Sequence, residues 1–193
     1  MGKGLNTVGK IVAWVLAVLL IVGVAGVIVY FVAKEEGADY FVEYNGEKYL
    51  GNAEGGKLDI TSGNEYRFEV KSLTGENVNF DVKVTSNPAN NFEYTVDGKL
   101  CVWNGSDDKA NDYTSIFNVQ KDETGFTLAA PEKFGIYDIL QAKYPGQTVD
   151  SGPLDAKDYF LLTVSVGESS VAFWFGTSAA TMGITLSPSE IVF

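Results

Sequence analysis

The pattern of hydrophobic and polar residues divides the chain into an apolar run near the N-terminus and a long alternating part. The run begins at Ile11 and ends at Ala33, 23 consecutive residues without a charged side chain. As an α-helix it would measure about 35 Å, enough to cross a bilayer hydrocarbon core about 30 Å thick. Trp14 and Tyr30 lie near its two ends, where aromatic rings prefer the lipid–water interface. We predict a transmembrane helix over residues 11–33, with the lipid bilayer as its partner.

The charged residues on either side predict the orientation of this helix. Lys3 and Lys10 precede it, whereas two glutamates follow Lys34 at once. Basic residues stay on the cytoplasmic side of a membrane. The expected domains are therefore a cytoplasmic head at residues 1–10, a spacer at residues 34–38 and an extracytoplasmic domain at residues 39–193. The protein is predicted to cross the cell membrane once; a cleaved secretory signal with its apolar core at residues 11–22 is the alternative.

Beyond residue 38 hydrophobic residues alternate with polar ones, which is typical of antiparallel strands with one face in a core. The alternation is clearest at residues 66–71, for which residues 78–84 are the expected partner strand. Asn45-Gly46 and Asp97-Gly98 favour type I′ turns and so predict two hairpins. Their strands are expected at residues 39–44 with 47–50 and at 92–96 with 99–103. Further strands are expected at residues 58–61, 126–130, 160–166, 171–175 and 184–193.

One segment, residues 131–144, has the period of a helix instead. Ile136, Tyr137, Leu140 and Tyr144 would form one apolar stripe along it. Pro131 suits the first turn of a helix, and the Pro-Gly pair at residues 145–146 would end it. We therefore predict a helix that needs an apolar surface to cover.

The hairpin of residues 160–166 and 171–175 offers such a surface, because both of its faces are apolar. The helix is expected to dock on the face that carries Tyr159, Leu161 and Trp174. The predicted fold class is all-β: an antiparallel β-sandwich, Ig-like or related, with one packed α-helix, preceded by the transmembrane helix.

Composition and charge exclude several kinds of chemistry. Twelve basic and 25 acidic residues follow residue 33, a formal charge of −13. Such a surface repels nucleic acid, which proteins bind through clustered lysine and arginine. The chain has no histidine, which excludes Ser-His-Asp and Cys-His catalysis and histidine-ligated zinc or haem. Cys101 is the only cysteine, so no internal disulfide can form. We expect no cofactor and no metal site.

Exposed aromatic residues are the better hint of a binding site. Trp103 ends one strand of the second hairpin, and Phe92 and Tyr94 lie on the strand opposite. Such rings could stack on sugar faces or anchor a protein, and we predict a binding patch of Trp103, Tyr94 and Phe92. Packing in the core is the alternative. The polar loop at residues 104–112 has oxygen ligands of the kind that calcium takes, but not the spacing of a calcium loop.

Three short segments resemble bacterial immunoglobulin-like surface domains of group 2. Residues 183–193, Gly-Ile-Thr-Leu-Ser-Pro-Ser-Glu-Ile-Val-Phe, are similar to the opening strand of these domains. Residues 85–89, Thr-Ser-Asn-Pro-Ala, and residues 96–100, Val-Asp-Gly-Lys-Leu, resemble two later segments. In this chain the opening-strand sequence comes last, and the predicted helix is not usual in the family. The resemblance implies an adhesion or spacer role in the bacterial envelope, without catalysis.

The sequence therefore favours a non-enzymatic module with a binding, adhesion or spacer role in the cell envelope, and an unknown protein or glycan partner. Two other functions stay open. An exported hydrolase could use two carboxyl groups in a pocket, about 5–9 Å apart. Alternatively, the membrane helix could dock into a larger complex, with the chain as its accessory subunit.

Overall fold

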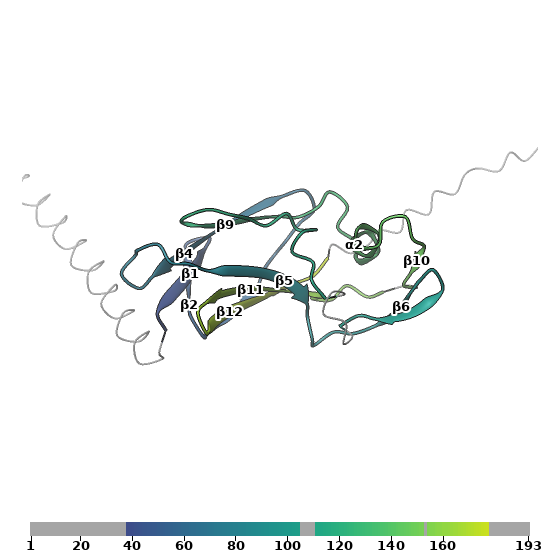
Figure 1. Ribbon diagram of the computed structural model, residues 1–193, viewed down its shortest axis with the longest axis horizontal. Coiled ribbons are helices and arrows are strands. Elements are labelled where there is room, and N and C mark those ends of the chain that lie inside the picture. Colours follow the sequence, from purple (N-terminus) through teal and green to yellow (C-terminus); the bar gives the residue numbers. More distant parts are fainter. Residues whose placement is uncertain (1–37, 105–110, 153, 178–193) are drawn as a thin grey trace, which may run out of the picture.

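The computed structural model describes residues 38–104, 111–152 and 154–177. Within these ranges the chain is mostly β-structure, in three sheets, with the helix α2 beside the smallest of them (Figure 1). No helix in the described ranges has the length and apolar character needed to span a bilayer. The predicted membrane span at residues 11–33 and the predicted strand at residues 184–193 lie outside these ranges.

Sheet A has five antiparallel strands in the order β2-β1-β4-β9-β8. They are β1 (Tyr40–Tyr44), β2 (Glu47–Leu50), β4 (Glu65–Ser72), β8 (Gln120–Lys121) and β9 (Gly125–Ala129). The predicted hairpin at its edge is confirmed. Asn45 and Gly46 have φ angles of 51° and 82°, the positive values that a type I′ turn requires.

Sheet B has four strands in the order β3-β12-β11-β5. They are β3 (Glu54–Lys57), β5 (Asp81–Ser86), β11 (Phe160–Val166) and β12 (Ser169–Phe175). The predicted β11–β12 hairpin is confirmed, and β3 joins β12 as a parallel neighbour. The strand predicted at residues 58–61 is wrong: Leu58 and Ile60 are buried, but their segment is an irregular connection that follows β3.

The predicted pairing between residues 66–71 and 78–84 is also wrong. β4 is flanked by β1 and β9, so neither of its edges is free, and only an isolated bridge joins Lys71 to Asn77. After that bridge the chain crosses to sheet B, where β5 pairs with β11. The alternation was read correctly, since Val82 and Val84 are buried, but they contribute to the inner face of the other sheet.

The core lies between the inner faces of sheets A and B. Phe68 of β4 stacks on Phe126 of β9 and meets Phe173 of β12, with ring centroids 4.7 and 5.9 Å apart. The hydroxyl of Tyr40 crosses the layer and donates to the carbonyl oxygen of Val164 at 3.0 Å. These contacts make the larger part of the domain a two-layer β-sandwich, as predicted, in which all pairs are antiparallel except β3 with β12.

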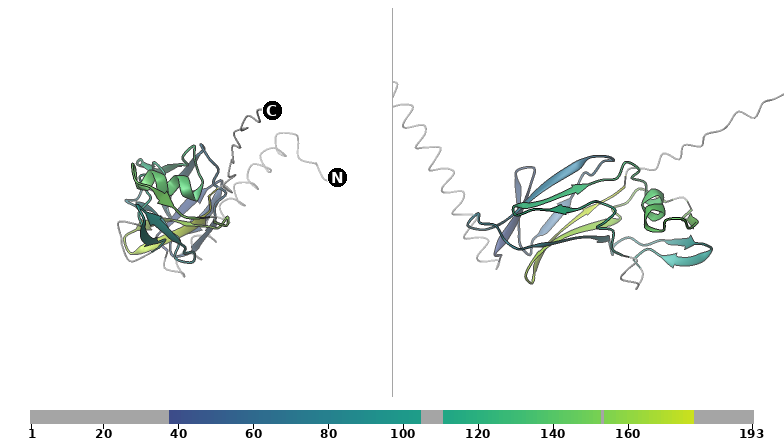
Figure 2. Two further views of the ribbon diagram at one scale, coloured as in Figure 1. Left: turned by 90° about the vertical axis from the view of Figure 1, so that its right-hand side faces the viewer. Right: turned by 45° about the horizontal axis from the view of Figure 1, so that its top comes forward.

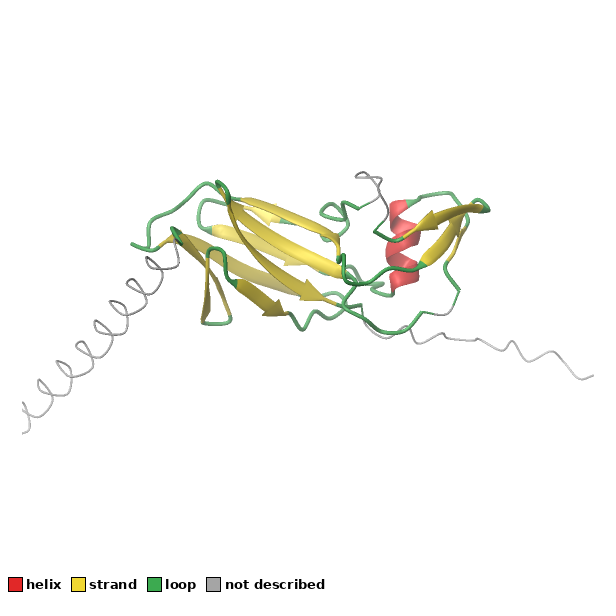
Figure 3. Ribbon diagram, turned by 90° about the horizontal axis from the view of Figure 1, so that it is seen from below, coloured by secondary structure: helices red, strands yellow, loops and turns green. Residues whose placement is uncertain are grey.

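Sheet C and α2 form a second assembly at one end of the sandwich (Figure 3), which we call the distal unit. Its elements are β6 (Glu93–Val96), β7 (Lys99–Val102), α2 (Ile136–Lys143) and β10 (Val149–Asp150). The predicted β6–β7 hairpin is confirmed, with Asp97 and Gly98 at φ angles of 48° and 75°. Figure 2 shows α2 in front when the molecule is viewed from this end.

The helix is shorter than predicted and lies on another surface. It begins at Ile136, because the preceding residues are bound elsewhere: the backbone N–H of Gly63 donates to the carbonyl oxygen of Pro131. Its buried face consists of Ile136, Ile139 and Leu140, whereas Tyr137, predicted for that face, is exposed.

The predicted docking of the helix on Tyr159, Leu161 and Trp174 is wrong. α2 contacts β10, and Tyr144 just after the helix shares a hydrogen bond of 3.0 Å with Tyr94 of β6. Leu161 and Trp174 are directly opposite each other on the outer face of sheet B and are half-buried. Sheet C, whose third strand β10 is only two residues long, supplies the apolar surface beside α2 in place of the predicted one.

Candidate functional site

The three predicted patch residues do come together, but two of them lie in the core. The ring of Phe92 stacks on Trp103 with centroids 5.1 Å apart and lies 5.9 Å from Tyr94. Trp103 is 1% exposed and Tyr94 3%, and Phe92 is half-buried. The expectation of an exposed ring patch is therefore wrong for Trp103 and Tyr94.

Trp103 is buried because it seals the junction between the distal unit and the sandwich. Its ring also contacts Tyr113 at 4.9 Å and meets Phe160 of β11 edge-on at 5.5 Å. Tyr159, another residue predicted to receive the helix, is buried against Phe92, with centroids 5.4 Å apart. Among the residues that the structure describes, the indole Nε1 of Trp103 has no hydrogen-bond partner, so the described contacts of this side chain are ring contacts.

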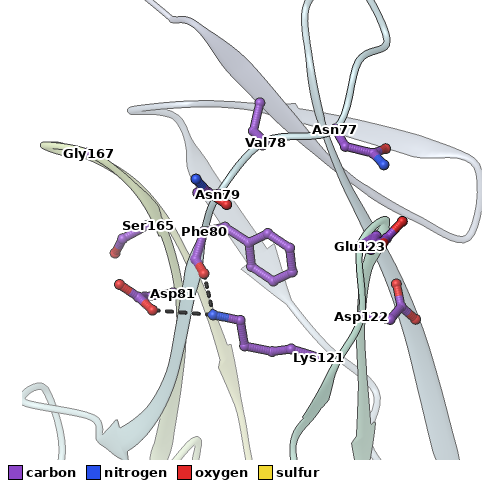
Figure 4. A pocket seen from close by; sticks show the side chains of 10 residues that line it. All are labelled: Asn77, Val78, Asn79, Phe80, Asp81, Lys121, Asp122, Glu123, Ser165 and Gly167. Carbon is purple, nitrogen blue, oxygen red and sulfur yellow. Dashed lines mark hydrogen bonds and ion pairs between the residues drawn. The ribbon is translucent and has the colours of Figure 1, made fainter.

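A cleft that we call the Lys121 cleft lies at the other end of the sandwich, between the two sheets (Figure 4). Its volume is about 720 Å³. It lies at the end where the described chain starts, since the N–H of Leu73 donates to the carbonyl oxygen of Asp39 nearby. The cleft is lined by Asn77, Val78, Asn79, Phe80, Asp81, Lys121, Asp122, Glu123, Ser165 and Gly167.

The lysine that lines this cleft already has polar partners within the protein. Lys121 of β8 donates to Asp81 at 3.2 Å and to the carbonyl oxygen of Phe80 (Figure 4). Its ammonium group also lies 4.8 Å from the centroid of the Phe80 ring. These contacts connect the short strand β8 of sheet A to the start of β5 in sheet B. They also fix the orientation of the Lys121 side chain.

The neighbouring carboxylate, Asp122, is held as an anion. Arg67 binds it through both guanidinium nitrogens, with N–O distances of 2.5 and 3.0 Å, and Thr124 donates to it from both its backbone and its side chain. The arginine, followed by the bonds from Thr124, holds the pKa of Asp122 well below its usual range. A general acid for glycoside hydrolysis needs the opposite shift. Asp122 is thus suited to structure rather than to proton transfer.

Metal ligation has little support in the part of the chain that the structure describes. No group of three or more acidic, histidine or cysteine side chains is placed to hold a metal ion among those residues. Of the polar loop considered for calcium, Asn104 accepts a hydrogen bond of 3.0 Å from Ser86, and residues 105–110 lie outside the described ranges.

The residues of the cleft were missed by the sequence reasoning. Lys121 ends β8, Asp122 begins the β8–β9 turn, and Phe80 lies just before β5, more than 35 residues away along the chain. The only local signal was the turn sequence Asp-Glu-Thr-Gly at residues 122–125.

Comparison with protein-family models, with characterised proteins and with solved structures gives no match to this chain. The resemblance to group 2 immunoglobulin-like domains stays a prediction.

Proposed function

We propose that the protein is a membrane-anchored, extracytoplasmic module without enzymatic activity, which holds its distal unit away from the membrane to bind a protein or glycan partner. The anchor is the apolar run of residues 11–33, and the acidic sandwich acts as the spacer. The role matches the adhesion or spacer function that the immunoglobulin-like resemblance implies.

The placement of the start of the described chain carries this proposal. Tyr40 pairs with Ser72 and donates a hydrogen bond to Val164, so the described chain starts at the end of the sandwich that holds the Lys121 cleft. From there β12 runs from Ser169, beside Tyr40, to Phe175 at the opposite end. Seven residues of strand measure about 20 Å. The distal unit lies beyond that opposite end, farthest from the point of entry (Figure 1).

The ion pairs at the Lys121 cleft support a spacer rather than a catalytic role for the sandwich. Lys121 is paired with Asp81 and Asp122 is paired with Arg67, so these four charged groups bind one another. The formal charge of −13 after residue 33 also disfavours close contact with anionic lipid headgroups.

Protease accessibility tests the orientation on which the proposal depends. The full chain is produced in a bacterial host with different epitopes at its two ends, and external protease is added to spheroplasts. We expect loss of the C-terminal epitope and survival of the N-terminal one, which becomes cleavable only after detergent is added. A variant with Lys3→Glu and Lys10→Glu is the matched control, since it should weaken this orientation. A protected C-terminal epitope, or release of the domain into the medium, would contradict the anchored model of function.

A further inference from the structure

The outer edge of β7 is an open strand edge at the distal unit. In the order β10-β6-β7, β7 has one neighbour. The N–H of Trp103 donates to the carbonyl oxygen of Phe92 at 2.8 Å, which fixes the alternation of the hairpin: Lys99, Cys101 and Trp103 direct their backbone groups toward β6. Leu100 and Val102 consequently direct theirs away from it, and no described residue accepts or donates there.

The side chains of the same two residues are unusually exposed. Leu100 is 65% exposed and Val102 44%, and the third exposed large hydrophobic residue of the described ranges is Tyr137 on α2. An open edge that also presents apolar side chains is a template for another strand. Natural proteins usually pair or cover such an edge.

The chain itself supplies a suitable strand close by. Thr177, the last described residue, lines a cleft together with Asn90, which precedes β6 by three residues. The chain therefore leaves the described domain at the base of the β6–β7 hairpin. Residues 178–193 follow, and the first ten of them carry no charge.

The sequence of this segment has the pattern that the edge requires. Ile184 and Leu186 alternate with Thr185 and Ser187, and Pro188, which has no N–H to donate, comes next. The five residues 178–182 span up to about 17 Å when extended, and the four residues of β7 measure about 13 Å. The segment is thus long enough to run along the hairpin from its base toward its turn.

We propose that residues 183–187 add to the outer edge of β7 within the same molecule. A strand that runs from the base toward the turn is parallel to β6 and antiparallel to β7. In the register that covers the apolar pair, Leu186 lies opposite Leu100 and Ile184 opposite Val102, and their backbones exchange hydrogen bonds. Thr185 then lies opposite Cys101 at a non-hydrogen-bonded position, and Pro188 ends the pairing.

Disulfide trapping tests this register, because Cys101 is the only native cysteine. Residues opposite each other at a non-hydrogen-bonded position have Cβ atoms about 4.5–5.5 Å apart, close enough for a disulfide after slight adjustment. The Thr185→Cys variant of the full chain, in detergent micelles with copper–phenanthroline as the oxidant, should form a disulfide within one molecule. The matched control is Leu186→Cys, whose thiol would face the opposite side of the sheet and should react at least tenfold more slowly.

The other outcomes overturn the proposal. Equal rates for the two variants would mean random collisions of an unpaired segment, and the absence of any cross-link would exclude the register. Cross-linked dimers without the intramolecular product would assign the edge to a second copy of the chain.

Amide hydrogen exchange of the wild-type chain provides a measurement that needs no cysteine variant. The N–H groups of Leu100 and Val102 should exchange at least tenfold more slowly than in a variant with Ile184→Asp and Leu186→Asp, independently of protein concentration. Equal exchange in the two chains, or protection that grows with concentration, refutes pairing within the molecule. These results are independent of the epitope experiment, so the two proposals can fail separately.

Discussion

Replacement of Trp103 tests whether its side chain stabilises the core or binds a ligand. The side chain is 1% exposed and packs against the rings of Phe92, Tyr113 and Phe160. Truncation of such a residue to alanine usually costs about 3–5 kcal/mol, because apolar burial is lost and a cavity is left behind. Nε1 of Trp103 has no hydrogen-bond partner among the described residues, and removing an unsatisfied buried donor recovers about 1–3 kcal/mol, which offsets part of this loss. We expect Trp103→Ala to lower the free energy of unfolding by about 2 kcal/mol.

The Trp103→Phe variant sharpens the argument. Phenylalanine keeps a ring in the cluster and removes the unsatisfied N–H, so the free energy of unfolding should stay within about 1 kcal/mol of the wild-type value. Urea unfolding of the full chain in detergent micelles, followed by far-UV circular dichroism, measures both variants. Glu93→Ala, at an exposed position of the adjoining strand β6, is the control and should change the value by less than about 0.5 kcal/mol. The reasoning is refuted if Trp103→Ala is as stable as this control.

Two further predictions concern single polar groups. Tyr40→Phe should lower the free energy of unfolding by about 1 kcal/mol, because the hydroxyl bonded to Val164 is lost. Burial raises the pKa of Tyr40 to about 12, so its contribution is complete below pH 10 and declines as the pH rises toward 12; urea midpoints of the two chains should converge over that interval. Asp122→Asn should lower the urea midpoint at pH 6. The difference between the two midpoints should begin to shrink when the pH falls below about 4, and it should vanish once the pH is below the lowered pKa of the folded carboxyl. If the difference in midpoint were unchanged at pH 2, the stabilisation by the Arg67–Asp122 pair would not depend on the charge of Asp122.

The elements of the fold could be predicted where local geometry decides them. Period-two alternation placed β11 at its observed bounds, and the dipeptides Asn45-Gly46 and Asp97-Gly98 placed two hairpins, because few other residue pairs adopt two successive positive φ angles. Alternation shows that a strand has a buried face, but it does not show which sheet that face belongs to. For this reason residues 78–84 were assigned to the wrong partner.

The candidate site depended on contacts between residues far apart in the sequence. Trp103 directly follows the exposed residues Leu100 and Val102 of β7, and its burial depends on packing against distant rings such as that of Phe160. The apolar face of the helix could have packed on either of two apolar surfaces. One of them, sheet C, could not be predicted from the sequence, because it depends on the pairing of the two-residue strand β10 with β6. The cleft of Lys121 and Asp81 likewise exists only because sheets A and B meet.

By itself, the sequence determined the all-β class, the turns, the absence of histidine chemistry and the strongly acidic charge, because each of these is a property of a residue or of its immediate neighbours. Only the tertiary structure decided which strands share a sheet, which aromatic rings are buried and which edge stays open. Those features depend on contacts between residues far apart in the sequence, such as Tyr40 and Val164. The free energy of these contacts is a sum over the whole domain, and no single segment of the chain determines it.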